Sequence, residues 1–233
     1  MCRKISNMLD VQTLEKVYGA SFAYPNLYEP RTVIDGKDEE TIEIITQNQP
    51  HKIIPAIWGM LPSTYEDEWS YFQSISDTLN LTEDILDNSE IYKDCLASRR
   101  CIIPVSGFFI YYLHKGILYP FYVYDPKGEP LHIAGVYTNL KDGFCTVSML
   151  TVEENHDTTC IQNVEETIPL LINRDKVQEW LSDDLEDDKI HSFFTETSLV
   201  PLSKHPVARE FFRNDITYDS ILDPVAYRDL PVT

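Results

Sequence analysis

Residues 98–112 have the sequence SRRCIIPVSGFFIYY, and this stretch decides the fold. Its β-branched and aromatic residues are typical of buried strands. Pro104 cannot donate to a neighbouring strand and Gly107 weakens a strand interior, so we expect a bend or bulge between them. Residues 114–116, His-Lys-Gly, predict a turn, and residues 117–124 the returning strand of a hairpin. We expect this hairpin to form the centre of the fold.

The segments around the hairpin predict an α+β domain. Apolar residues recur at helical spacing over residues 11–18, with Asp10 as the N-cap and Gly19 closing the helix. Ser89 predicts a cap for a short helix over 90–97, and Asn173 one for a later helix. Further strands are predicted at 41–46, 52–58, 131–137, 144–152 and 166–172. This order indicates a mostly antiparallel, barrel-like sheet flanked by a few helices.

The chain has no Gly/Ser-rich linker and no repeat, so we expect residues 1–233 to form one domain. Residues 65–77 are acidic and aromatic and predict a surface segment. From about residue 204 to residue 233 the pattern predicts an irregular C-terminal extension.

The composition is strongly acidic, with 38 Asp and Glu against 19 Lys and Arg and a formal net charge of −19. Proteins that bind nucleic acid tightly show the opposite balance, because phosphate contacts need basic side chains. A basic groove can still exist locally, since salt confines electric fields to about 10 Å. The overall charge counts against DNA as a tight general partner.

The cysteines and the N-terminus indicate a cytoplasmic protein. Five cysteines, at positions 2, 95, 101, 145 and 160, form no Cys-x-x-Cys pair. An odd number without pairing predicts reduced thiols rather than disulfides or a zinc site. Neither a signal peptide nor an apolar run of about 18–20 residues is present, so we expect no membrane association. Nothing in the sequence points to a cofactor or a metal.

Cys2 is the first candidate for chemistry. Removal of Met1 leaves a cysteine whose α-amine and thiol have reference pKa values of about 8 and about 8.5. The amine of such a 1,2-aminothiol condenses with an aldehyde to a Schiff base, and the thiol then closes a stable thiazolidine ring. Taken alone, a cysteine at position 2 is most simply incidental.

Several motifs elsewhere in the sequence favour a functional role for Cys2. They are Met1-Cys2, residues 58–62 (WGMLP), residues 99–104 (RRCIIP) with Gly107-Phe108, residues 134–137 (AGVY) and residues 168–172 (IPLLI). Their order and spacing resemble the SRAP family, SOS-response-associated, peptidase-like proteins that shield abasic sites in single-stranded DNA. The resemblance covers about residues 1–182 and implies a single SRAP-like domain. It implies that Cys2 crosslinks to the ring-opened sugar aldehyde of an abasic site.

The family's other site residues are only partly present. Its Asn-Ala-Arg motif begins here with Asn80, but Thr82 stands in the place of the arginine. Its catalytic glutamate position holds Ile110, which cannot transfer a proton. Tyr111 replaces the following tryptophan and could still stack on a base.

The position of the catalytic histidine depends on the insertion allowed before Thr167-Ile168-Pro169, which stands for the family's Arg-Met-Pro. It falls on Gln162 or on Glu165, of which Glu165 could act as a base. His156, in the same segment, is most simply a surface residue. The nucleic-acid contacts that the resemblance implies are Lys4, Trp58, Arg99, Arg100 and Tyr111.

Three functional hypotheses follow. In the first, the chain is an abasic-site protein whose crosslinking is impaired by the missing acid–base groups, each worth about 10²–10⁴ in rate. In the second, it is a chemically silent SRAP-fold module that binds a partner without crosslinking. The third, a cysteine peptidase, is weakest because no base is securely positioned beside Cys2. The sequence does not assign an oligomeric state.

Overall fold

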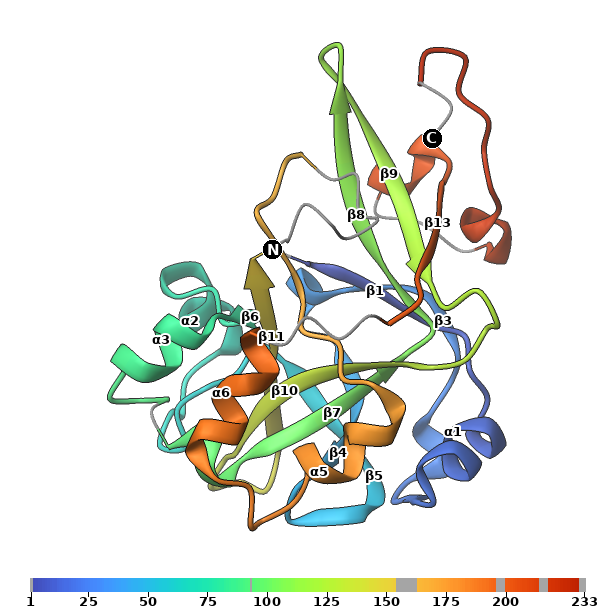
Figure 1. Ribbon diagram of the computed structural model, residues 1–233. Coiled ribbons are helices and arrows are strands. Elements are labelled where there is room, and N and C mark those ends of the chain that lie inside the picture. The colour runs from blue at the N-terminus through green and yellow to red at the C-terminus, as the bar shows by residue number, and fades with distance from the viewer. Residues whose placement is uncertain (1, 93, 154–162, 196–199, 214–217, 231–233) are drawn as a thin grey trace.

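The computed structural model describes residues 2–92, 94–153, 163–195, 200–213 and 218–230, which form an α+β fold with two sheets (Figure 1). The smaller sheet has five antiparallel strands in the order β13-β9-β8-β1-β3. Their bounds are β1 Lys4–Asn7, β3 Arg31–Asp35, β8 Gly107–His114, β9 Ile117–Tyr124 and β13 Ser203–Pro206. In Figure 1 the β8–β9 hairpin projects from the rest of the molecule, with β13 beside it.

The larger sheet closes on itself and confirms the barrel-like prediction. It runs in the order β12-β11-β10-β7-β4-β5-β2, and β6 also pairs with β11. A parallel pairing of β11 with β5, through Thr146↔Ile57 and Val147↔Trp58, closes five of these strands into a ring. The bounds are β2 Ser21–Phe22, β4 Thr41–Thr46, β5 Gln49–Trp58, β6 Asn80–Leu81, β7 Arg100–Val105, β10 Leu131–Asn139, β11 Cys145–Glu153 and β12 Thr167–Pro169.

The predicted bend in residues 98–112 joins the two sheets. β7 ends at Val105 within the barrel and β8 begins at Gly107 in the smaller sheet, with Ser106 between them. Gly107 is required at this junction, because a Cβ there would lie 2.4 Å from the Tyr122 ring and 2.5 Å from the Val123 carbonyl oxygen. One continuous apolar run therefore supplies a strand to each layer.

The predicted hairpin forms, but it belongs to the smaller sheet and projects from the molecule instead of forming the centre of the fold (Figure 1). β8 and β9 pair without interruption from Gly107↔Tyr124 to His114↔Ile117. The two turn residues, Lys115 and Gly116, have φ of 48° and 78°. Two positive φ values are typical of the tight turns whose twist matches that of paired strands.

The helices lie around the barrel, with α2 and α3 on one side and α1 on another (Figure 1). α1 begins as predicted, with the Asp10 carboxylate accepting from the Thr13 N–H at 2.6 Å, and ends at Gly19 with φ of 61°. The bounds are α1 Val11–Tyr18, α2 Trp69–Ile75, α3 Glu83–Asn88, α4 Cys95–Ser98, α5 Val177–Trp180 and α6 Asp187–Thr195. None of the helices in the described residues is long and apolar enough to cross a membrane.

Two helix predictions need correction. The short helix is α4, which begins only at Cys95, because the Ser89 hydroxyl accepts from the Ile91 N–H and forms a turn instead of capping a helix. The segment 65–77 lies mostly at the surface, as predicted, and contains α2, whose buried Trp69 donates to the Gly59 carbonyl at 3.1 Å. Asn173 does precede helical structure, first the 3₁₀ turn η3 (Arg174–Lys176) and then α5, but its side chain makes no capping bond.

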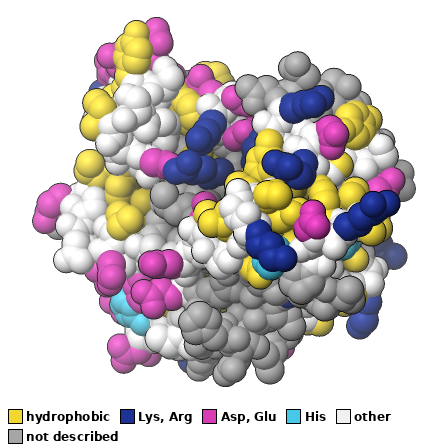
Figure 2. Space-filling model, turned by 90° about the horizontal axis from the view of Figure 1, so that it is seen from above, with side chains coloured by type: hydrophobic (Ala, Val, Ile, Leu, Met, Phe, Trp, Pro, Cys, Tyr) yellow, Lys and Arg dark blue, Asp and Glu magenta, His cyan; other side chains and the backbone are white. Residues whose placement is uncertain are grey.

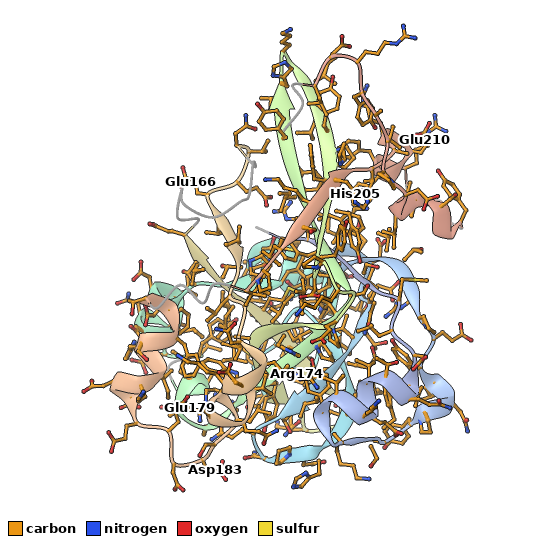
Figure 3. The ribbon with its side chains drawn as sticks, turned by 45° about the vertical axis from the view of Figure 1, so that its right-hand side comes forward. Glu166, Arg174, Glu179, Asp183, His205 and Glu210 are labelled. Carbon is orange, nitrogen blue, oxygen red and sulfur yellow. The ribbon has the colours of Figure 1, made fainter. Side chains whose placement is uncertain are left out.

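The C-terminal extension is folded rather than irregular. It contributes β13 and two 3₁₀ turns, η4 (Arg209–Phe212) and η5 (Asp219–Leu222). Phe211 and Ile221 are fully buried against Phe109 of β8. His205 of β13 (Figure 3) contacts the rings of Tyr122 and Tyr124, and its ring N–H donates to the Leu222 carbonyl at 2.6 Å. The extension therefore covers one face of the smaller sheet.

Candidate functional site

Cys2 lies just before β1 and is buried, with 3% of its surface exposed. Its thiol donates to the Lys4 carbonyl at 3.4 Å. Burial, together with a smaller effect of the negative charge of Glu165, raises the pKa of Cys2 to about 12. The thiol is therefore protonated at neutral pH and needs a base before it can act as a nucleophile.

Asn80 holds the backbone of Cys2. It is the first residue of β6, which is fixed by parallel pairing with Met149 of β11. Its amide nitrogen donates to the Cys2 carbonyl oxygen at 2.7 Å, across 78 residues of sequence. Its amide oxygen is buried and has no hydrogen-bond partner among the described residues. The two family positions kept in this chain are thus in direct contact.

Glu165 and Tyr111 complete the group around Cys2. Glu165 is half-buried in the segment that leads into β12, and its charge raises the pKa of Cys2. Burial raises the pKa of Tyr111, and the charges of Cys2 and Glu165 raise it further. The Cys2 sulfur also has a hydrogen bond with the backbone of Phe109, two residues before Tyr111 on β8. Cys2, Glu165 and Tyr111, from three distant segments, therefore influence one another electrostatically. Gln162, the other candidate for the histidine position, and His156 lie outside the described residues.

The two cations next to Cys2 are already paired with aspartates. Arg3 contacts Asp77 at 3.3 Å, and Lys4 contacts Asp35 at 2.7 Å. The Lys4 ammonium also lies 5.1 Å from the centre of the Phe211 ring. Both cations are at the site, but each carries a neutralising partner that would compete with a phosphate.

Two of the expected nucleic-acid contacts are buried structural residues. Trp58 has no exposed surface, and its indole N–H donates to the Leu79 carbonyl at 2.9 Å. Arg100 is also fully buried, and its guanidinium donates to the backbone carbonyls of Trp180 at 2.8 Å and Ala97 at 2.9 Å, and to those of Leu96 and Ser182. Neither side chain is accessible to DNA; Arg100 instead attaches the α5 segment to the barrel.

The remaining expected contacts lie in different places. Arg99 is half-buried at the start of β7 and hydrogen-bonds Cys95, so a six-residue strand of about 20 Å separates it from the Cys2 end. Tyr111 is near Cys2, with its ring stacked on that of Phe212 at 5.9 Å. Ile110, at the family's glutamate position, is buried in the core, with 2% exposed. Of the two expected aromatic contacts, Tyr111 is therefore the one that is partly exposed.

Figure 2 shows where charge gathers on one face of the molecule. Several Lys and Arg side chains surround a hydrophobic area on one part of this face, whereas Asp and Glu dominate elsewhere on it. A patch of basic side chains, with some acidic ones between them, is thus present on a protein whose net charge is −19.

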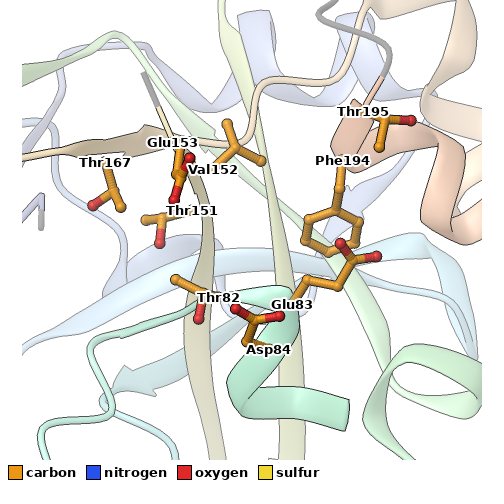
Figure 4. Close-up of a pocket in the computed structure, with 9 residues that line it drawn as sticks. All are labelled: Thr82, Glu83, Asp84, Thr151, Val152, Glu153, Thr167, Phe194 and Thr195. Atoms are coloured by element: carbon orange, nitrogen blue, oxygen red, sulfur yellow. The ribbon is translucent and has the colours of Figure 1, made fainter. Parts of the chain in front are cut away.

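An acidic pocket of about 330 Å³ lies between α3, β11, β12 and α6 (Figure 4). Thr82 and Thr167, which replace two arginines of the family pattern, both line it. The carboxylates around it are Glu83, which is paired with His191, and Asp84 and Glu153. The sequence analysis missed this pocket, although the acidic run after Asn80 was a signal. Within the described residues, no group of three or more His, Cys, Asp or Glu side chains could hold a metal ion.

Comparison with known proteins identifies the family and the fold. The family model for SOS response associated peptidase (SRAP) matches residues 1–213, further than the 1–182 expected. A crystal structure of a Bacteroides thetaiotaomicron protein aligns with a TM-score of 0.85 at 19% identity, covering 97% of this chain and all of that one. A Bordetella bronchiseptica protein aligns with a TM-score of 0.74 at 18% identity, covering 89% of this chain and all of that one.

A phage-related protein of Bordetella bronchiseptica gives a TM-score of 0.66 at 15% identity, covering 89% of this chain and 95% of that one. No curated protein sequence matches the chain. At these identities the structures establish the fold alone, while the family model covers most of the sequence. The chain therefore belongs to the SRAP family of SOS response associated peptidases.

Proposed function

We propose that this protein binds single-stranded DNA and crosslinks to abasic sites through Cys2, in the cytoplasmic response to DNA damage. The observation that carries the proposal is the hydrogen bond from Asn80 to the Cys2 carbonyl oxygen. It fixes the backbone of Cys2, and the charge of Glu165 acts on the Cys2 thiol. Both features favour ordered chemistry at a terminal aminothiol. The basic patch in Figure 2 offers the phosphates a local site on an acidic protein.

The reaction balances without an oxidant or reductant. After Met1 is removed, the Cys2 amine attacks the C1′ aldehyde of the ring-opened sugar, and loss of one water gives a Schiff base. The Cys2 sulfur then bonds to the same carbon, and the thiol proton ends on the nitrogen. The product is a thiazolidine that joins protein and DNA.

Glu165 supplies the base that these reaction steps need. Because the pKa of Cys2 is raised to about 12, very little thiolate exists at neutral pH. A carboxylate close to the sulfur can take the thiol proton as the carbon–sulfur bond forms and return it to the nitrogen. In this chain Glu165 thus takes the role that the family gives to histidine.

The test uses protein that begins at Cys2, released from a cleavable N-terminal fusion and verified by intact mass. It is incubated with a single-stranded oligonucleotide that contains one abasic site and is then run on a denaturing gel. We expect a protein–DNA adduct that is absent with the intact oligonucleotide and with Cys2→Ala. The matched control, Cys145→Ala, removes a different buried thiol and should keep the adduct. Failure of the verified protein to form an adduct contradicts the proposal.

A second candidate is a silent module that binds a partner without crosslinking. The specific observation in its favour is Ile110, which places a buried aliphatic side chain where the family carries a glutamate. The burial of the Cys2 thiol and the aspartate partners of Arg3 and Lys4 point the same way. Single-stranded DNA binding by fluorescence anisotropy, with no adduct from the same preparation, supports this candidate over the first.

A further inference from the structure

A second pocket, separate from the Cys2 site, lies on the outside of the barrel. It has a volume of about 220 Å³ and lies between the β4–β5 hairpin, residues 22–28 and the turn between β10 and β11. Four aromatic side chains line it, from Phe22, Tyr24, Tyr28 and Phe144, and one carboxylate, from Glu43. None of its lining residues belongs to the Cys2 group.

The Glu43 carboxylate is unusual for such a wall. It lies on β4 opposite Pro55 and is 91% buried, with 9% exposed. The positive charge of Arg31 lowers the pKa of Glu43, but its guanidinium pairs with Glu40 and donates to the Thr41 carbonyl oxygen rather than to Glu43. Within the part of the chain that the structure describes, Glu43 forms no ion pair and no hydrogen bond to another side chain. The hydrogen bond that its carboxylate does accept comes from its own backbone N–H. Burying a carboxylate without an ion-pair partner is unfavourable, and a bound cation could offset that cost.

Two of the four aromatic side chains belong to the core and two are exposed at the edge of the pocket. Phe22 and Tyr28 form the inner wall, with ring centres 4.9 Å apart. Tyr24 and Phe144 are exposed to 58% and 62%, at the rim. Large apolar groups that stay exposed beside a cavity mark a ligand site more often than a packing defect. The faces of such rings attract cations.

We propose that this pocket binds the alkylated ammonium head of an organic cation. The carboxylate supplies the counter-charge, and the aromatic faces supply cation–π contacts with its methyl groups. A primary ammonium would lose three hydrogen bonds to water in a wall with so few acceptors, whereas a quaternary head has none to lose. The volume is below the roughly 300–1,000 Å³ of pockets for drug-sized ligands, which fits a head group.

The experiment titrates choline into the full protein and follows binding by NMR or calorimetry. The neutral carbon isostere of choline, 3,3-dimethyl-1-butanol, has the same shape without the charge. We expect saturable binding of choline, at least tenfold weaker binding of the isostere, and a loss of about tenfold or more in Glu43→Gln and in Tyr24→Ala. Glu29→Gln, an exposed neighbour, and Cys2→Ala should bind choline as the parent does.

The outcomes separate clearly. No saturable choline binding, equal binding of choline and its isostere, or unchanged binding in a folded Glu43→Gln overturns the proposal. A second arm compares choline with a short peptide that carries trimethyllysine. Tighter binding of the peptide assigns the head group to a protein partner, and equal or weaker binding assigns it to a free small molecule. Crosslinking through Cys2 is measured separately, so either proposal can fail while the other stands.

Discussion

Two buried acids, the Cys2 thiol and the Glu43 carboxyl, hold their protons more tightly than they would in water. In each case burial is the largest cause, because removing water penalises the charged form. Burial raises the pKa of Cys2 to about 12 and that of Glu43 to about 7, although Arg31 opposes the second shift. The thiol thus depends on a neighbouring base, while Glu43 changes charge within the physiological range of pH.

Replacing Glu43 with glutamine should change how stability depends on pH. The pKa of Glu43 is higher in the folded protein, about 7, than its ordinary value of 4.5. Its stabilising contribution is therefore present below pH 4.5 and is lost as the pH rises through 7. We expect Glu43→Gln to match the parent near pH 4.5 and to exceed it at pH 8 by on the order of 3 kcal/mol. Urea unfolding at both pH values, with Glu29→Gln as control, measures this; equal stability at pH 8 contradicts it.

Replacing Glu165 with glutamine should slow crosslinking without preventing DNA binding. Glutamine keeps the size of the side chain but cannot accept the thiol proton, and loss of an acid–base group costs about 10²–10⁴ in rate. The neighbouring Glu166 is exposed and lies on the same segment (Figure 3), so Glu166→Gln is the matched control. The measurement is the rate of adduct formation on denaturing gels; equal rates for the two variants contradict the assignment.

At the scale of elements, the β7–β8 junction connects the two sheets and brings Cys2 to the site. Ser6 of β1 pairs with Gly107, and Ile5 pairs with Phe108. The Ser106 N–H also donates to the Ser6 carbonyl at 2.9 Å. The segment that carries Cys2 is therefore held against the first residues of β8. Any shift at the junction would move Cys2 as well as the sheet.

A single methyl group at the junction should be severely destabilising. In Gly107→Ala the new Cβ would lie 2.4 Å from the Tyr122 ring and 2.5 Å from the Val123 carbonyl, and the backbone there is fixed by pairing. We expect a loss of about 3 kcal/mol or more in free energy of unfolding. Gly116→Ala, at φ of 78° but with open space around the Cβ, should lose only about 1–2 kcal/mol. Denaturant unfolding compares them, and equal losses contradict the steric explanation.

At the scale of the whole molecule, charge should control the proposed binding of DNA. The net charge of −19 repels phosphates in general, so binding depends on the local basic patch in Figure 2 and on the salt concentration. At the Cys2 site, Asp77 and Asp35 reduce the attraction that Arg3 and Lys4 would exert. Affinity for single strands should therefore be modest and fall steeply with added salt.

Removing one of these aspartates should strengthen binding. Asp77→Asn leaves Arg3 without its carboxylate partner, and one freed cation adds about 0.7 to the slope of log affinity against log salt. We expect a several-fold lower Kd at low salt, measured by fluorescence anisotropy in a Cys2→Ala background. Glu66→Gln, which breaks the exposed pair with Lys141 at 3.0 Å, is the matched control. Unchanged affinity in Asp77→Asn shows that Arg3 does not contact DNA.

Local signals predicted much of the fold, and distant contacts explain what they missed. Pro104 and Gly107 marked the bend, and Asp10 and Gly19 bounded α1, because proline, glycine and capping residues act on their own backbone. Arg100 was assigned to phosphates because its acceptors, the carbonyls of Trp180 and Ser182, lie 80 or more residues away.

The candidate site was predicted in part for the same reason. The family pattern identified Cys2, Asn80 and, as one of two alternatives, Glu165, but the sequence alone could not bring them together. The pocket around Glu43 gave no signal, because residues 41–46 alternate like any strand. Only the folded chain brings the aromatic residues of the 22–28 segment over that carboxylate.

The central claim is that Cys2, held by Asn80 beside Glu165, forms a thiazolidine with an abasic site. The most direct measurement is the intact mass of protein that begins at Cys2 after reaction with an abasic oligonucleotide. We expect a species with the mass of the protein plus the oligonucleotide minus one water, and no such species with Cys2→Ala. In this adduct Cys2 should no longer react with iodoacetamide under denaturing conditions. A mass equal to unmodified protein, or an adduct of the same yield in Cys2→Ala, would contradict it.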